Sequence, residues 1–107
     1  MNLPQVITEL VKAQNNFDSN AYANCFSETA TVADEGKTYR GRAEIQEWIK
    51  KANDEYQTKM IPVEYFETKE TLKAEISGSF EGSPIMLDYH LKIVDGLIHS
   101  LETTSSD

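Results

Sequence analysis

The first half of the chain places apolar residues at the spacing of a helix. Five of them recur every three or four positions near the N-terminus, which predicts a helix with one buried face: Leu3, Val6, Ile7, Leu10 and Val11. A second, shorter helix is predicted after Asp18, because aspartate is a preferred N-cap residue. A third is predicted from Gly41, with an apolar face at Ile45, Trp48, Ile49 and Ala52.

The remaining apolar positions follow the two-residue period of strands. Thr29 to Asp34 is rich in β-branched residues and predicts a strand that ends in a turn over 34–37. After Tyr56 three strands are predicted, with these inward residues: Ile61, Val63 and Tyr65; Leu72, Ala74, Ile76 and Phe80; Ile85, Leu87, Tyr89, Leu91 and Ile93. Hairpin turns are predicted near 68–70, 82–84 and 95–96, and a last strand over 97–103.

This order of elements predicts an α+β domain in which the helices lie on one face of a curved, mostly antiparallel sheet. Such an arrangement encloses a cone. A chain of 107 residues is long enough for one domain and too short for two, so we expect a single domain over 1–107. Its ordered core is expected over about residues 3–103, followed by a frayed tail.

Composition narrows the range of partners. The chain has 18 acidic and 10 basic residues and a net charge of -8, which disfavours binding to nucleic acid or to an anionic membrane surface. Cys25 is the single cysteine, so an internal disulfide is excluded. No apolar run approaches the roughly 20 residues of a membrane span, and the N-terminus lacks the pattern of a signal peptide. We therefore expect a cytoplasmic protein.

Three segments carry a resemblance to a known family: "NNFDSNAYANCFSETATVAD", "YRGRAEIQEWI" and "LKIVDGLIHSLE". With the order of elements, they resemble the SnoaL-like branch of the nuclear-transport-factor-two-like superfamily, whose members include ketosteroid isomerases, polyketide cyclases and epoxide hydrolases. The resemblance implies a cone-shaped, cystatin-like fold with three N-terminal helices and an internal pocket. It also implies a homodimer formed through the outer sheet face, where we expect Met60, Phe66, Met86 and Val94.

The resemblance places Asp34 at the mouth of the pocket, in the position of the general base of ketosteroid isomerases. A carboxylate in a mostly apolar cavity can remove a proton next to a carbonyl, while fixed donors stabilise the enolate. Tyr89 matches the position of one donor of the family and has inward parity, so it is the candidate oxyanion donor. The alternative is an amphipathic core residue whose hydroxyl reaches a wet pocket. The family's tyrosine donor on the first helix falls at Leu10, which cannot donate.

Further candidates follow from the same comparison. Tyr22, Tyr39, Trp48 and Tyr65 are expected to form the walls of the pocket, although aromatic residues of this kind also fill ordinary cores. Polyketide cyclases of the resembled family use a His and Asp pair, which makes His99 an alternative acid or base. The alternation around His99 has apolar residues in both series and does not decide which face it occupies. No phosphate loop or metal-ligand spacing occurs, so we expect neither a cofactor nor a bound metal.

Two interpretations of function remain open on the sequence. In the first, the protein binds a small, mostly apolar molecule and acts as a cofactor-free isomerase or polyketide-cyclase-like lyase. In the second, it is a non-catalytic ligand-binding or dimerisation module of the same fold. Asp34 favours the first interpretation unless it is only a turn residue bonded to the backbone of 35–37, and Leu10 favours the second.

Overall fold

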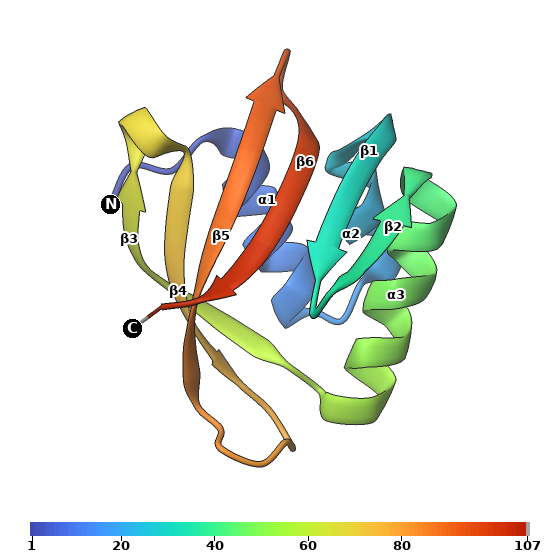
Figure 1. The fold of residues 1–107 in the computed structure, drawn as a ribbon, viewed down its shortest axis with the longest axis vertical. Coiled ribbons are helices and arrows are strands. Elements are labelled where there is room, and N and C mark those ends of the chain that lie inside the picture. Colours follow the sequence, from blue (N-terminus) through green and yellow to red (C-terminus); the bar gives the residue numbers. More distant parts are fainter. Residues whose placement is uncertain (107) are drawn as a thin grey trace.

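Three α-helices cover one face of a six-stranded sheet in the computed structural model, which describes residues 1–106 (Figure 1). The helices are α1 (Gln5–Asn15), α2 (Ser19–Asn24) and α3 (Gly41–Tyr56). The strands are β1 (Phe26–Asp34), β2 (Lys37–Arg40), β3 (Lys59–Phe66), β4 (Thr71–Ser77), β5 (Ile85–Val94) and β6 (Leu97–Ser105), with a short 3-10 turn over Glu67–Lys69. The predicted α+β architecture is therefore confirmed.

The strands lie in the order β2-β1-β6-β5-β4-β3. All neighbours are antiparallel except β1 and β6, which run parallel and join the first hairpin to the later meander. The β1–β2 hairpin was not predicted, because β2 has no buried residue and so carries no alternation. β6 continues to Ser105, two residues beyond the predicted end, and Asp107 lies outside the described residues.

Local chemistry explains where α2 and α3 begin and end. The Asp18 carboxylate accepts a hydrogen bond from the Ala21 backbone N–H at 3.0 Å, which caps α2 as the sequence predicted. Gly41 opens α3 at a φ of +81°, a conformation that favours glycine. Gln57 ends the same helix in the left-handed region, and its N–H bonds to the Asn53 carbonyl at 2.8 Å.

The predicted inward face of β3 is wrong at its start. Met60 is 1% exposed and lies opposite Ile76, whereas Ile61 and Val63 are 57% and 44% exposed. A bulge between Pro62 and Glu64 restores the expected parity.

The cause is a contact with α1. The Asn15 side chain donates to the Met60 carbonyl at 2.9 Å and accepts from the Met60 N–H at 2.8 Å, which fixes the register of the strand. Met60 therefore belongs to the core and not to the outer face of the sheet.

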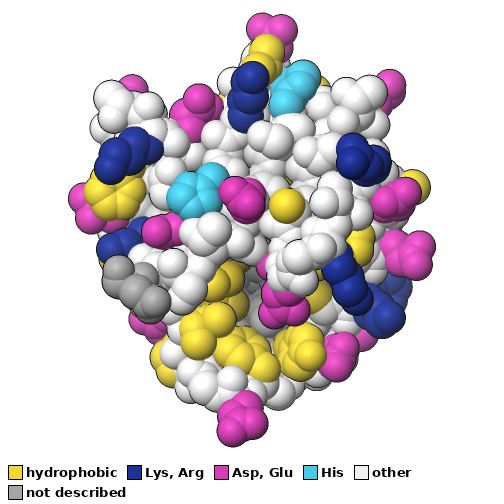
Figure 2. Space-filling view, viewed as in Figure 1, with side chains coloured by type: hydrophobic (Ala, Val, Ile, Leu, Met, Phe, Trp, Pro, Cys, Tyr) yellow, Lys and Arg dark blue, Asp and Glu magenta, His cyan; other side chains and the backbone are white. Residues whose placement is uncertain are grey.

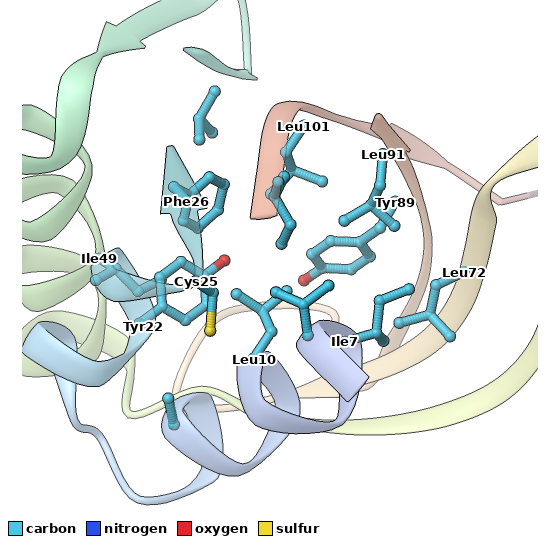
Figure 3. Close-up of a cluster of buried hydrophobic side chains, with 14 of the residues drawn as sticks. Ile7, Leu10, Tyr22, Cys25, Phe26, Ile49, Leu72, Tyr89, Leu91 and Leu101 are labelled. Atoms are coloured by element: carbon cyan, nitrogen blue, oxygen red, sulfur yellow. The ribbon is translucent and has the colours of Figure 1, made fainter. Parts of the chain in front are cut away.

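The core fills the space between the helices and the concave face of the sheet. Figure 3 shows side chains from α1 and α2 meeting those of β1, β4, β5 and β6. Fully buried members include Ile7, Leu10, Phe26, Leu72 and Leu101, at 0–1% exposure. Within residues 1–106, none of the helices has the length and apolar character that crossing a membrane requires.

Candidate functional site

The core does not fill the whole cone. A cavity of about 830 Å³ lies between α3 and the concave face of the sheet, and it opens near the β1–β2 turn and the connection from β4 to β5. This volume falls in the usual range of small-molecule sites. Figure 2 shows a hollow in the surface beside a group of hydrophobic side chains. Charged residues of both signs line the opening, including Glu35, Lys37, Glu55 and Lys59.

Asp34 lies in the cavity wall at the end of β1. The parallel pairing of β1 with β6 places Ala33 opposite Glu102, so the next residues along, Asp34 and Thr103, are neighbours. The Thr103 hydroxyl donates a hydrogen bond to Oδ1 of Asp34. Among the hydrogen bonds of residues 1–106, the Asp34 carboxylate is therefore bound by Thr103 of β6 and not by the backbone of residues 35–37.

Tyr89 continues the same row of side chains across the sheet. It lies on β5 opposite Thr103 of β6 on one side and Leu72 of β4 on the other, and it is 8% exposed. Since neighbouring strands are about 4.8 Å apart, the backbones of Asp34 and Tyr89 are separated by about 10 Å. This spacing leaves room for a reacting group between a carboxylate and a phenol that project from the same face.

The phenol of Tyr89 is held in its protonated form. Burial, and secondarily the nearby charge of Asp34, raise the pKa of Tyr89 well above the ordinary tyrosine value. Burial also raises the pKa of Tyr22, with smaller contributions from Tyr89, Cys25 and Asp34. Both hydroxyls are therefore donors at neutral pH.

The two hydroxyls converge. Figure 3 shows the oxygen atoms of Tyr22 and Tyr89 pointing toward one another from α2 and β5. Within residues 1–106, neither phenol oxygen has a hydrogen-bond partner. The only enclosed side-chain polar atoms without a partner in that range are Ser27 Oγ and Asp88 Oδ1. The two phenol oxygens therefore face open space, and both residues line the cavity.

Three of the four residues predicted to form the pocket walls line the cavity. These are Tyr22, Tyr39 and Trp48. The rings of Tyr39 and Trp48 are stacked with their centroids 5.4 Å apart, and those of Tyr22 and Trp48 are tilted by 60° with their centroids 6.2 Å apart. The structure does not bring Tyr65 or His99 to this cavity. Tyr65 lies in a separate surface groove beside Glu67 and Glu70. His99 lies in β6 at a register irregularity opposite Lys92 and Ile93, beside the inward-facing Ile98.

Two polar groups of the cavity were missed on the sequence. Thr103 lies two residues after the buried Leu101, so the alternation of the last strand could have placed its side chain on the inward face. Gln14 stands in the polar run Gln14-Asn15-Asn16, which gives no signal of burial, yet it is 5% exposed and lines the cavity. Within residues 1–106, no three His, Cys, Asp or Glu side chains come together in the way a metal site requires.

Comparisons with known proteins bear on the fold and the family of the chain. A proposed polyketide cyclase from Sinorhizobium meliloti is 32% identical, with 95% of each chain covered and a TM-score of 0.88. A protein with a ketosteroid isomerase-like fold from Catenulispora acidiphila, in complex with trimethylamine, is 20% identical, with 98% of this chain and 88% of that chain covered and a TM-score of 0.87. TerC, co-crystallised with polyporic acid, is 12% identical, with 95% of this chain and 89% of that chain covered and a TM-score of 0.83.

No protein-family model matches the chain, and no curated protein matches its sequence. The identity to the Sinorhizobium protein over 95% of both chains nevertheless shows the family. The chain belongs to the SnoaL-like branch of the nuclear-transport-factor-two-like superfamily, and it has the cystatin-like fold that other structural neighbours share. The family resemblance predicted from the sequence is confirmed.

Proposed function

We propose that this protein binds a small, mostly apolar, carbonyl-bearing molecule in the cavity and catalyses proton transfer at the carbon next to the carbonyl. The reaction is that of a cofactor-free isomerase or a polyketide-cyclase-like lyase. Asp34 is the base, and Tyr89 donates a hydrogen bond to the oxyanion that develops on the carbonyl oxygen. The 32% identical relative is itself a proposed polyketide cyclase, which supports this class of reaction.

The single observation that carries the proposal is the pairing of a held carboxylate with free phenols. Asp34 accepts from Thr103, which orients the carboxylate in the cavity wall. The hydroxyls of Tyr22 and Tyr89 have no hydrogen-bond partner among residues 1–106 and face the same cavity. A polar group that faces a cavity without a partner is able to bind a ligand without first breaking a bond within the protein.

Each group has a defined part in the reaction. The carboxylate of Asp34 takes the proton from carbon, and the electron pair of that C–H bond moves toward the carbonyl oxygen. The phenol of Tyr89, assisted by Tyr22, donates to that oxygen as its charge grows. The aromatic side chains Tyr39 and Trp48 offer flat apolar surface for the rest of the molecule. Return of the proton at a second carbon gives isomerisation, and attack of the enolate carbon on a second carbonyl gives cyclisation.

A second candidate function is a ligand-binding or dimerisation module without catalysis. The observation that favours it is Leu10, which occupies the position of the family's donor tyrosine on the first helix. Leu10 is 0% exposed and packs in the core, so α1 supplies no donor there.

The experiment that separates the two functions begins with binding. Carbonyl-bearing ring compounds, among them 2-tetralone, are screened by native mass spectrometry and by thermal shift. Uptake of deuterium from heavy water next to the carbonyl is then followed by NMR for the native protein and for Asp34→Asn. The amide introduced by this substitution still accepts from Thr103, so the fold is expected to be retained while the base is lost.

Glu35→Gln is the matched control, because it removes the same charge from the neighbouring, exposed position. We expect Asp34→Asn to slow exchange by about 10²- to 10⁴-fold with binding retained, and Glu35→Gln to leave the rate nearly unchanged. Binding without any exchange by the native protein would support the module instead. Equal loss in both variants would point to the local charge and not to a base.

We also propose that two copies associate through the outer face of the sheet. Phe66 and Met86 are half-buried there, and Val94 is 38% exposed. The exposed Ile61 and Val63 add apolar surface in place of the buried Met60. Sedimentation at micromolar concentration is expected to give a species of twice 12.1 kDa, and a single 12.1 kDa species would contradict the proposal.

The compartment is likewise a proposal. We propose that the protein acts in the cytoplasm, because its one cysteine is buried and needs no oxidising compartment. Cell fractionation tests this, and recovery in an extracytoplasmic fraction would contradict it.

A further inference from the structure

A buried amide forms a fixed corner of the cavity far along the sheet from Asp34. Gln14 on α1 donates from Nε2 to Asn53 Oδ1 at 2.9 Å, to the Thr58 carbonyl at 2.8 Å and to Thr58 Oγ1 at 2.7 Å. These partners come from α3 and from the residue before β3. Asp34 is on β1, which lies four strands from β3 in the sheet order.

The orientation of this amide is set by its partners. A backbone carbonyl can only accept, so the atom that lies 2.8 Å from the Thr58 carbonyl must be the nitrogen of Gln14. Both N–H groups of the amide are committed to acceptors on α3 and the following segment. A rotated amide would turn its oxygen against the Thr58 carbonyl and lose these bonds, so the side chain has one stable orientation.

The carbonyl oxygen of Gln14 is then the free end of the amide. Oε1 accepts no hydrogen bond from residues 1–106, and it is not among their enclosed atoms without a partner. The residue is 5% exposed and lines the cavity, so the space that Oε1 meets is the cavity itself. An acceptor without a donor is present here, in contrast to the phenol donors near Asp34.

We infer that Gln14 is a specificity-determining residue that accepts a hydrogen bond from a hydroxyl or N–H group of the ligand. The ligand class is therefore narrower than an apolar carbonyl compound: it carries a hydrogen-bond donor, such as a phenol or enol hydroxyl, in addition to the carbonyl. This inference concerns the cavity of the proposed function and deepens it by naming the substrate class. Asn53 and Thr58 act as positioning residues because they hold the amide in place.

The test compares two ligands that differ in one donor. 2-Naphthol and 2-methoxynaphthalene have the same ring system, and only the first can donate. Their dissociation constants are measured at pH 7 by fluorescence titration of the full chain. We expect 2-naphthol to bind about five- to tenfold more tightly, and we expect this preference to disappear in Gln14→Met, which keeps the length of the side chain without its amide.

A second pair of variants leaves Gln14 in place, so the inference can be tested even if Gln14→Met is unstable. Asn53→Ala removes one acceptor and frees the amide, so it is expected to reduce the preference. Asn53→Asp keeps an oxygen for Gln14 Nε2 and is expected to retain it. Because the readout is a ratio of two affinities in one variant, a general weakening of the fold cancels.

Equal affinities in the native protein, no measurable binding of 2-naphthol, or an unchanged ratio in Gln14→Met would each overturn the inference. Neither probe has a carbonyl group, so the result does not depend on catalysis. Failure of deuterium exchange would refute the proposed reaction and leave the naphthol ratio standing. A ratio of one together with Asp34-dependent exchange would refute only the role of Gln14.

Discussion

Replacing Tyr89 by phenylalanine should separate the catalytic and structural roles of this side chain. The ring packs in the core at 8% exposure, but the hydroxyl has no hydrogen-bond partner among residues 1–106. Tyr89→Phe therefore removes no bond within the protein and keeps the packed ring. We expect the free energy of unfolding to change by less than about 1 kcal/mol, because a typical buried hydrogen bond contributes about that much and none is lost here.

The expected effect on turnover is much larger. Removal of one donor from an oxyanion site costs about 10²- to 10³-fold in rate. Tyr22 moderates the loss, since its hydroxyl points toward that of Tyr89 and remains available (Figure 3). We therefore expect a decrease near the lower end of this range. Tyr89→Phe should therefore change the free energy of unfolding little and the exchange rate strongly.

The assay is deuterium exchange on the ketone that the native protein exchanges fastest, together with urea denaturation of each variant. Tyr65→Phe is the matched control, because Tyr65 lies outside the cavity in a surface groove. The control should leave the exchange rate unchanged. Exchange by Tyr89→Phe at the native rate would refute the oxyanion role, and a loss of several kcal/mol in stability would show that the hydroxyl has a structural partner.

Three other substitutions or conditions test the fold. Gly78→Ala should destabilise the protein by about 1–3 kcal/mol in urea denaturation, because the new Cβ would lie 2.6 Å from the Tyr56 carbonyl oxygen; an unchanged midpoint would contradict the close approach. Asp18→Ala should cost about 1 kcal/mol through loss of the cap on Ala21, measured in the same way. Burial and then Glu9 raise the pKa of Cys25 from 9.0 to about 11. Between these values the unfolded thiol ionises and the folded one does not, so stability should fall as pH rises from 9 to 11. Cys25→Ala should reduce that slope, and the rest of it comes from Tyr22 and Tyr89, whose pKa burial also raises.

The alternation of apolar residues predicted most elements because one series in each was apolar. β4 and the middle of β5 follow this rule, with Leu72, Ala74 and Ile76 buried on one face and Tyr89 and Leu91 on the same side. At the start of β3 both series contain apolar residues, so the period alone does not choose between them. The choice is made by Asn15, whose amide binds both backbone groups of Met60 from 45 positions away in the sequence.

The family resemblance pointed to Asp34 and, together with inward parity, to Tyr89, and both line the cavity. Three of the predicted wall residues, Tyr22, Tyr39 and Trp48, line it as well. The Thr103 hydrogen bond spans 69 positions and depends on the parallel pairing of β1 with β6, which no local pattern encodes. The role of Gln14 depends in the same way on a corner formed by α1, α3 and the segment before β3.

The departure of Leu10 from the family pattern has a physical explanation in the arrangement of the phenols. An oxyanion requires donors at particular points in space, and the element that carries each donor is secondary. Here α2 and β5 bring the hydroxyls of Tyr22 and Tyr89 to a common region, as Figure 3 shows, and both have their pKa raised by burial. Leu10, at 0% exposure, completes the apolar core instead. A donor pair built from these two elements is therefore compatible with the loss of the donor on α1, and the chemistry of the fold does not require a tyrosine there.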